Sequence, residues 1–180
     1  MKNLLFLLII LFTLSCCDKD NNPFSVNDQL PAETQTGANT VGCLVNGQVF
    51  LPKQEGINPD VNCFYQLVDG EYFFTMNFAD LRGTGRKDVS VQTFRINLQA
   101  NQTYVLNKNY ILDGDYTGGG GSYSTSLSNE FNTNTIKTGE LKITKLDSAN
   151  AIISGTFWFD AINSAGEVVE IRNGRFDWNY

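Results

Sequence analysis

Short turn sequences between alternating segments most limit the folds open to this chain. Asn46-Gly47, Asp69-Gly70 and Asn173-Gly174 each lie between runs in which apolar and polar residues alternate. Asn, Asp and Gly tolerate the positive φ that both central residues of a tight β-hairpin turn require. Each dipeptide therefore predicts two antiparallel strands joined by a two-residue turn.

The second hairpin also predicts its own register. A two-residue turn at Asp69-Gly70 places three apolar or aromatic pairs on one face: Leu67 with Tyr72, Tyr65 with Phe74, and Cys63 with Met76. The first hairpin places Cys43 opposite Phe50 in the same way. Where turn and alternation agree, the buried face and the register are both specified.

The C-terminal part of the chain carries the densest strand pattern. Segments 139–146, 151–161, 167–172 and 175–180 alternate with a period of two, and no ten-residue helical period follows the N-terminal leader. We expect a single domain, residues 41–180, with an all-β fold. The architecture is an antiparallel β-sandwich or flattened barrel of about nine to ten strands built from hairpins.

A glycine-rich segment interrupts this pattern. Four consecutive glycines, residues 118–121, predict a mobile loop, because glycine has the greatest backbone freedom and no side chain to pack. Asp113 and Asp115 precede them and are calcium candidates. Since no Glu closes a twelve-residue calcium loop here, we assign no metal and no cofactor.

The N-terminus has the pattern of a secretory leader. Lys2 precedes eleven mostly apolar residues, Leu4 to Leu14, which as a helix span about 16 Å, roughly half of a bilayer core. This predicts a signal peptide, residues 1–16, rather than a transmembrane helix. Its end, Leu14-Ser15-Cys16-Cys17, resembles the lipobox of bacterial lipoproteins, in which Leu lies three residues before the lipidated Cys.

Two observations favour Cys17 as the lipidated residue, with Cys16 as the alternative. Leu14 lies three positions before Cys17, and cleavage before Cys17 leaves an even pair, Cys43 and Cys63. Lipidation of Cys16 would instead leave an odd thiol, which an oxidising exterior disfavours. The remaining pair either forms a Cys43–Cys63 disulfide or stays as two separate buried thiols.

Residues 17–40 are polar, lack a period and contain two prolines, which predicts a flexible tether after the lipidated cysteine. The tether begins with Asp18-Lys19-Asp20-Asn21-Asn22, which resembles the export signal of Bacteroidota-type surface lipoproteins. The alternative is the start of a solvated linker. The resemblance implies a lipid anchor in the outer membrane and a domain exposed at the cell surface.

Three longer segments, residues 36–50, 139–147 and 153–161, resemble a family of Bacteroidota lipoproteins of uncharacterised function. The resemblance covers most of the chain after the leader. It implies the all-β fold and the surface location, and it supplies no catalytic or binding residues.

Composition excludes several kinds of chemistry. The chain has no histidine, which removes Ser-His and Cys-His nucleophile pairs and His-ligated zinc. Its net charge of −6 and the lack of a basic run give no electrostatic reason to bind nucleic acid. The partner that the sequence indicates is the membrane, through the lipid anchor.

Among the remaining functions we expect a surface binding module for a glycan, a protein or a small ligand, and no enzyme. Aromatic rings stack on sugar faces, and the candidate contacts are Trp158, Tyr116 and Tyr123. One alternative is a structural or accessory subunit of an envelope complex. Another is a hydrolase with paired carboxylates drawn from Glu140, Asp160 and Glu170.

Overall fold

The computed structural model describes residues 29–82, 85–126 and 128–180. The signal peptide, Cys16, Cys17 and the tether up to residue 28 lie outside the described residues. In the described part, no helix is long and apolar enough to cross a membrane. The described residues form eleven strands: β1 (Thr40–Val45), β2 (Gln48–Phe50), β3 (Val61–Val68), β4 (Glu71–Asp80), β5 (Lys87–Phe94), β6 (Thr103–Leu106), β7 (Gly118–Ser126), β8 (Asn129–Asn132), β9 (Gly139–Asp147), β10 (Ile152–Ile162) and β11 (Val168–Asn179).

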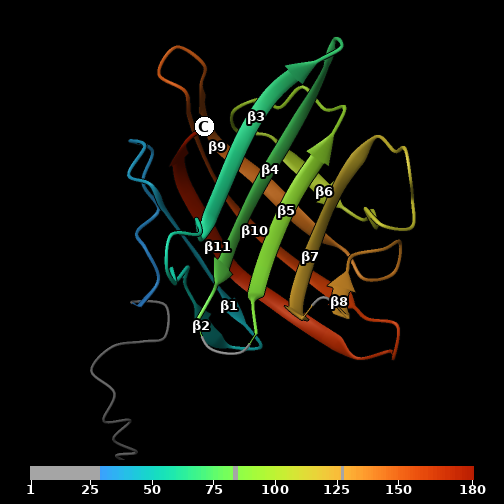
Figure 1. Ribbon diagram of the computed structural model, residues 1–180. Coiled ribbons are helices and arrows are strands. Elements are labelled where there is room, and N and C mark those ends of the chain that lie inside the picture. The colour runs from blue at the N-terminus through green and yellow to red at the C-terminus, as the bar shows by residue number, and fades with distance from the viewer. Residues whose placement is uncertain (1–28, 83–84, 127) are drawn as a thin grey trace, which may run out of the picture.

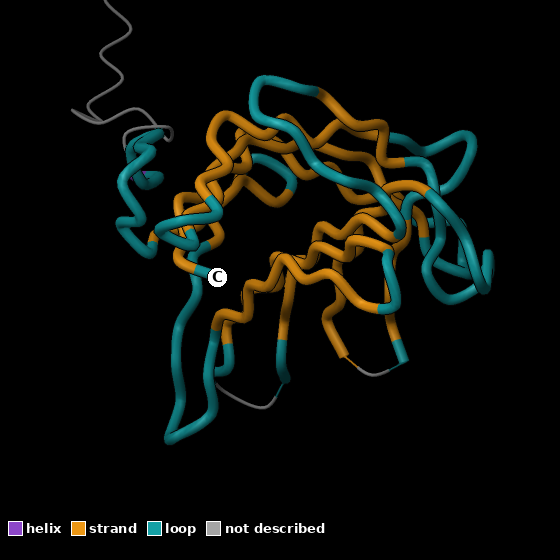
Figure 2. Tube along the Cα trace, turned by 90° about the horizontal axis from the view of Figure 1, so that it is seen from above, coloured by secondary structure: helices purple, strands orange, loops and turns teal. Residues whose placement is uncertain are grey.

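The strands form one continuous sheet that folds over on itself into two layers (Figures 1 and 2). The strand order is β2-β1-β11-β10-β9-β6-β7-β5-β4-β3. In Figure 1, β3, β4, β5 and β7 lie in front, and β9, β10 and β11 cross behind them. At one side β6 joins β7 to β9 and β8 joins β7 to β10. At the other side the backbone amide of Lys53, after β2, donates to the carbonyl of Ala79 in β4 at 2.9 Å.

The all-β prediction is confirmed, and two layers of this kind agree with a β-sandwich or flattened barrel. The described residues contain eleven strands rather than nine to ten. One pair, β6 with β7, is parallel, so the sheet is mixed rather than wholly antiparallel. The short strands β6 and β8 join the two layers, and β6 forms the parallel pair with β7.

Two of the three predicted hairpins are confirmed in their registers. Asn46-Gly47 joins β1 to β2 with Cys43 opposite Phe50. Asp69-Gly70 joins β3 to β4 with the three predicted pairs. All four turn residues have positive φ, between 48° and 86°, as a tight hairpin turn requires.

Side chains from both layers fill the space between them. The phenylalanines of β4 and β10 are central to this packing, and Phe74, Phe78 and Phe159 are all fully buried. Other side chains with no exposed surface come from both layers: Met76, Val89, Val91, Leu141, Ile143, Ile153 and Ile171. The interior is therefore packed with apolar groups, which directs the search for a binding site to the outer faces and the loops.

Asn173-Gly174, expected as a third hairpin turn, lies instead inside the single long strand β11. Phe157 pairs with Gly174 and Phe159 pairs with Ile171, so two steps along β10 match three steps along β11. On its other side β11 shows the same three-for-two match with β1. The dipeptide is thus a β-bulge, because the two flanks pair with β10 and β1 rather than with each other.

Residues 118–121, expected as a mobile loop, are the first half of strand β7 and are largely buried. A Cβ on Gly120 would lie 2.6 Å from the carbonyl oxygen of Lys108, and one on Gly121 would lie 2.7 Å from Cδ1 of Phe159. Neighbouring atoms occupy the space that a side chain needs, so these glycines serve close packing. The prediction of a mobile loop was wrong because crowded strands and flexible loops both favour glycine.

Gly120→Ala should lower the free energy of unfolding by about 1–3 kcal/mol, since its methyl group would meet a backbone carbonyl that has little room to move. Urea denaturation measures the change. Gly85→Ala is the matched control, because the nearest atom to its Cβ would be the carbonyl oxygen of Thr125 at 3.5 Å. Equal stability of the two variants would contradict the crowding of β7.

Candidate functional site

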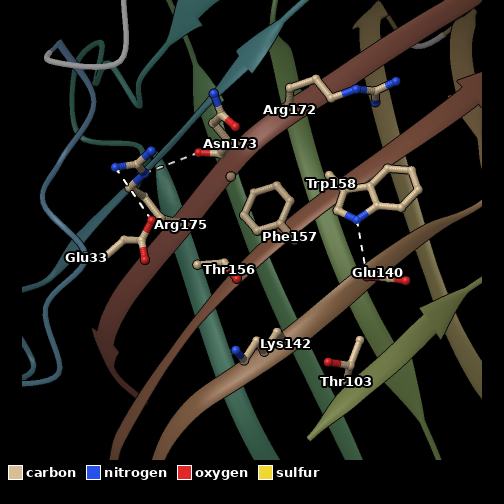
Figure 3. A pocket seen from close by; sticks show the side chains of 11 residues that line it. Glu33, Thr103, Glu140, Lys142, Thr156, Phe157, Trp158, Arg172, Asn173 and Arg175 are labelled. Carbon is tan, nitrogen blue, oxygen red and sulfur yellow. Dashed lines mark hydrogen bonds and ion pairs between the residues drawn. The ribbon is translucent and has the colours of Figure 1, made fainter. Parts of the chain in front are cut away.

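A polar groove of about 380 Å³ lies on the outer face of the layer formed by β6, β9, β10 and β11 (Figure 3). Its walls come from four strands and from the segment that precedes β1. The lining residues are Glu33, Thr103, Glu140, Lys142, Thr156, Phe157, Trp158, Arg172, Asn173, Gly174 and Arg175.

Trp158 is the aromatic centre of this groove. Its side chain points outward from β10 and is 38% exposed. The indole Nε1 donates to Oε2 of Glu140 at 3.4 Å, and the guanidinium carbon of Arg172 lies 5.5 Å from the centre of the ring. Arg172 in turn binds Oδ1 of Asp160 at 2.5 Å. The ring is thus held from two sides while part of it faces solvent.

The β-bulge at Asn173 places two arginines on the groove. In a regular strand, residues three positions apart point to opposite faces. The extra residue in β11 resets this alternation, so Arg172 and Arg175 both line the outer groove. The intervening Gly174 faces inward, where a Cβ would lie 2.4 Å from Cε2 of Phe157.

A row of polar side chains crosses the groove floor beside Trp158. Thr103, Lys142, Thr156 and Arg175 are directly paired from strand to strand across β6, β9, β10 and β11. Among the described residues, neither Lys142 nor the hydroxyls of Thr103 and Thr156 have a hydrogen-bond or ion-pair partner. Thr103, Lys142 and Thr156 therefore offer donors and acceptors that no other described residue uses.

The segment before β1 forms one wall of the groove. Oε1 of Glu33 lies 3.8 Å from Nη1 of Arg175 (Figure 3). The same guanidinium donates to the carbonyl of Pro31 at 3.4 Å. Residues 29–39, which the sequence places in the tether, thus include one groove-lining residue, Glu33. Leu30 is buried, 7% exposed.

Asp177 of β11 holds this segment in place. Its carboxylate accepts hydrogen bonds from the Thr34 hydroxyl at 2.6 Å and from the amides of Thr36, Gly37 and Ala38 at 2.8–3.1 Å. The Ser154 hydroxyl donates to it from β10 at 2.8 Å. Burial opposes ionisation, but these donors outweigh burial and hold the pKa of Asp177 well below its ordinary value.

Of the three aromatic residues predicted to contact a ligand, only Trp158 lies in the groove. Tyr116 and Tyr123 are buried, with 7% and 8% of their surface exposed. Tyr116 packs on Phe94 at 4.9 Å between ring centres, and Tyr123 packs on Phe131 at 6.0 Å. Neither ring is open to a ligand. The sequence did not reveal this burial, because glycine-rich and polar neighbours along the chain do not show what covers a side chain in space.

The calcium candidates have other partners. Asp113 accepts a hydrogen bond from the amide of Asn109 at 2.7 Å, whereas Asp115 forms an ion pair with Arg95. The described residues contain no cluster of three or more metal-binding carboxylates or thiols. Nothing in this arrangement brings the two carboxylates to one ion.

The acids considered for a hydrolase are also engaged. Asp160 and Glu170 both contact Arg172, at 2.5 Å and 3.6 Å, and Glu140 accepts from Trp158. Of these three acids only Glu140 lines the groove. Asp160 and Glu170 are direct partners across β10 and β11 and share Arg172, whereas Glu140 contacts Trp158.

Cys43 and Cys63 are free thiols, so the structure has the second of the two predicted alternatives and not the disulfide. Cys43 lies in β1 and Cys63 in β3, near the two opposite ends of the strand order. Burial raises the pKa of the Cys63 thiol to about 12 and that of Cys43 further. Both therefore behave as small apolar groups of the core.

Of the charged residues that line the groove, sequence reasoning identified only Glu140 as a functional candidate. Glu33, Lys142, Arg172 and Arg175 were not singled out. The one available signal was Asn-Gly between two arginines, which is compatible with a bulge as well as with a turn.

Comparison with known proteins identifies a family. The chain belongs to the family described as Domain of unknown function (DUF6252), whose sequence profile matches residues 66–177. The match runs from β3 into β11 and includes every groove-lining residue except Glu33. No curated protein and no solved structure matches the chain.

Asp177→Asn should destabilise the domain by about 2–4 kcal/mol at pH 7, because an amide places a donor among buried donors. The pKa of Asp177 is lower in the folded protein than in the unfolded chain, where it is about 3.9. The ionised carboxylate therefore stabilises the folded state above that unfolded value, and this contribution is lost as the pH falls through the folded pKa. The difference in free energy of unfolding between the wild type and Asp177→Asn should therefore be constant above about pH 5 and shrink in acid. Urea denaturation at several pH values measures it.

Asp69→Asn, in an exposed hairpin turn, is the control for the loss of one carboxylate. It should leave stability nearly unchanged. A variant at Asp177 with wild-type stability, or a gap that does not change with pH, would contradict the role given to this carboxylate.

Proposed function

We propose that this member of the DUF6252 family is a lipid-anchored surface protein whose outer groove binds carbohydrate, with Trp158 as the stacking platform. The single observation that carries the proposal is the half-exposed indole, held by Glu140 and Arg172 within a groove of polar side chains. Arg172 occupies one side of the ring, so a sugar stacks on the remaining surface.

The chemistry of the groove suits a sugar better than an apolar ligand. A pyranose ring has an apolar face, which stacks on an aromatic ring, and a rim of hydroxyls, which need donors and acceptors. Thr103, Thr156 and Lys142 supply such groups beside Trp158. Small-ligand sites usually combine an aromatic contact surface with a few well-placed polar groups.

The proposed location rests on the N-terminal sequence. Lipidation at Cys17 would attach the chain to the outer membrane, and the Asp18–Asn22 segment would direct it to the cell surface. Glu33 lines the groove only sixteen residues after Cys17, so an extended tether would span at most about 55 Å. The groove would therefore meet glycans close to the cell's own surface.

Trp158→Ala should weaken carbohydrate binding about 30-fold or more, as expected for a tryptophan anchor worth about 2 kcal/mol. A glycan array first identifies a binder, and titration calorimetry then compares the variants. Tyr110→Ala is the control, because Tyr110 has nearly the same exposure, 39%, and lies outside the groove. An array without binders, or unchanged affinity in the Trp158 variant, would refute the proposal.

A second candidate function, a subunit of an envelope assembly, is favoured by a different surface. Phe64, Val68, Phe73 and Phe94 line an apolar groove of about 280 Å³ on the outer side of β3, β4 and β5. The terminal strand β3 contains no charged residue, and charges are what usually protect an exposed strand edge from pairing.

Extraction of the native protein in mild detergent tests this second candidate. We expect the extracted complex to have a mass well above that of one 20.0 kDa chain in a detergent micelle. Val68→Lys on β3 should reduce the mass of the complex. A chain that migrates as a monomer in both forms would exclude a stable assembly through this surface.

A further inference from the structure

We propose that the groove selects carbohydrates that carry a carboxylate or a sulfate, and that Lys142 and Arg175 bind this anionic group. The inference rests on the proposed function, since it names the class of sugar for the same groove. It comes from the charges of the lining residues and from how each charge is already used.

Cations outnumber acids in the groove although the chain as a whole is acidic. Lys142, Arg172 and Arg175 line it against Glu33 and Glu140, whereas the net charge of the chain is −6. Two further acids, Asp160 and Glu170, pair with Arg172 from outside the groove, so anion binding falls to the individual cations Lys142 and Arg175 rather than to a net positive charge.

The three cations are not equivalent. Arg172 is neutralised by Asp160 and Glu170, which lie outside the groove. Lys142 has no ion pair and no hydrogen bond with another described residue, and its side chain projects from an exposed position of β9. An uncompensated ammonium on the wall of a groove is available to a ligand.

Arg175 has only a replaceable partner for its charge. The Glu33 side chain is 59% exposed and its Oε1 lies 3.8 Å from Nη1, too long for a strong hydrogen bond. The Arg175 side chain is well covered, with 17% of it exposed. Glu33 offers the same chemical group as a uronic acid, so a ligand carboxylate takes its place on Arg175.

The register places the anion site beside the stacking platform. Lys142 and Arg175 flank Thr156 on the two neighbouring strands, which sets their backbones about 10 Å apart. Trp158 lies two residues along β10 from Thr156, about 7 Å away on the same face. A sugar that stacks on Trp158 therefore places a substituent over Thr156, between the two cations.

The experiment compares matched ligands by titration calorimetry on the full-length protein in detergent. The probes are an oligogalacturonate, its neutral methyl ester and a carrageenan oligosaccharide, which carries sulfate and no carboxylate. We expect one of the two anionic probes to bind at least tenfold more tightly than the methyl ester, and increasing salt to weaken it. Because each anionic probe carries only one kind of anionic group, the tighter binder of the two tells carboxylate from sulfate recognition.

Two substitutions test the residues. Lys142→Met should weaken the preferred anionic probe about fivefold or more and leave the methyl ester unchanged. Lys87→Met, which removes the same charge at an exposed position of β5 outside the groove, should change neither. Glu33→Gln should tighten the anionic probe, because the internal competitor is removed.

The outcomes separate this inference from the function on which it rests. If the methyl ester binds as tightly as the acid and Trp158→Ala abolishes both, the groove binds sugars but the anion site is wrong. If Lys142→Met and Lys87→Met behave alike, Lys142 has no role in recognition. If no probe binds and the glycan array is also empty, the carbohydrate function itself fails.

Discussion

The fold depends on phenylalanine rings that lie directly against glycine backbone. A Cβ would come within 2.4 Å of Phe157 at Gly174 and within 2.7 Å of Phe159 at Gly121. Gly155 provides the same kind of space, so glycines in β7, β10 and β11 all face aromatic rings. Because interiors are packed to crystal-like density, these glycines are as specific a part of the core as the rings they face.

This packing also determines the groove. The β-bulge that turns Gly174 toward Phe157 adds one residue to β11, and the same residue brings Arg172 and Arg175 onto one outer face. The inner packing and the outer charge pattern of β11 therefore have a single cause. A strand without the bulge would direct one of the two arginines into an apolar interior, where a charge is very costly.

The sequence predicted those parts of the fold that local interactions determine. In the hairpins at Asn46-Gly47 and Asp69-Gly70, each strand pairs with its neighbour in sequence, so turn and alternation define the register. At Asn173-Gly174 a hairpin and a bulge place the same residues, Ile171 and Phe176, on the core face. The pattern cannot distinguish them, because the choice depends on pairing with the distant strands β1 and β10.

The candidate site also has a part that local sequence pattern predicts and a part that depends on distant segments of the chain. Trp158, named from the sequence as a candidate contact, does lie in the groove, but no local pattern reveals that Asp177 on β11 is only 1% exposed. The segment that covers Asp177 lies about 140 residues earlier in the chain, beyond the reach of any local pattern. Since this segment follows Glu33 directly, the carboxylate that fixes the start of the domain also fixes one wall of the groove. The proposed binding groove and the path toward the proposed membrane anchor are thereby joined at one buried charge.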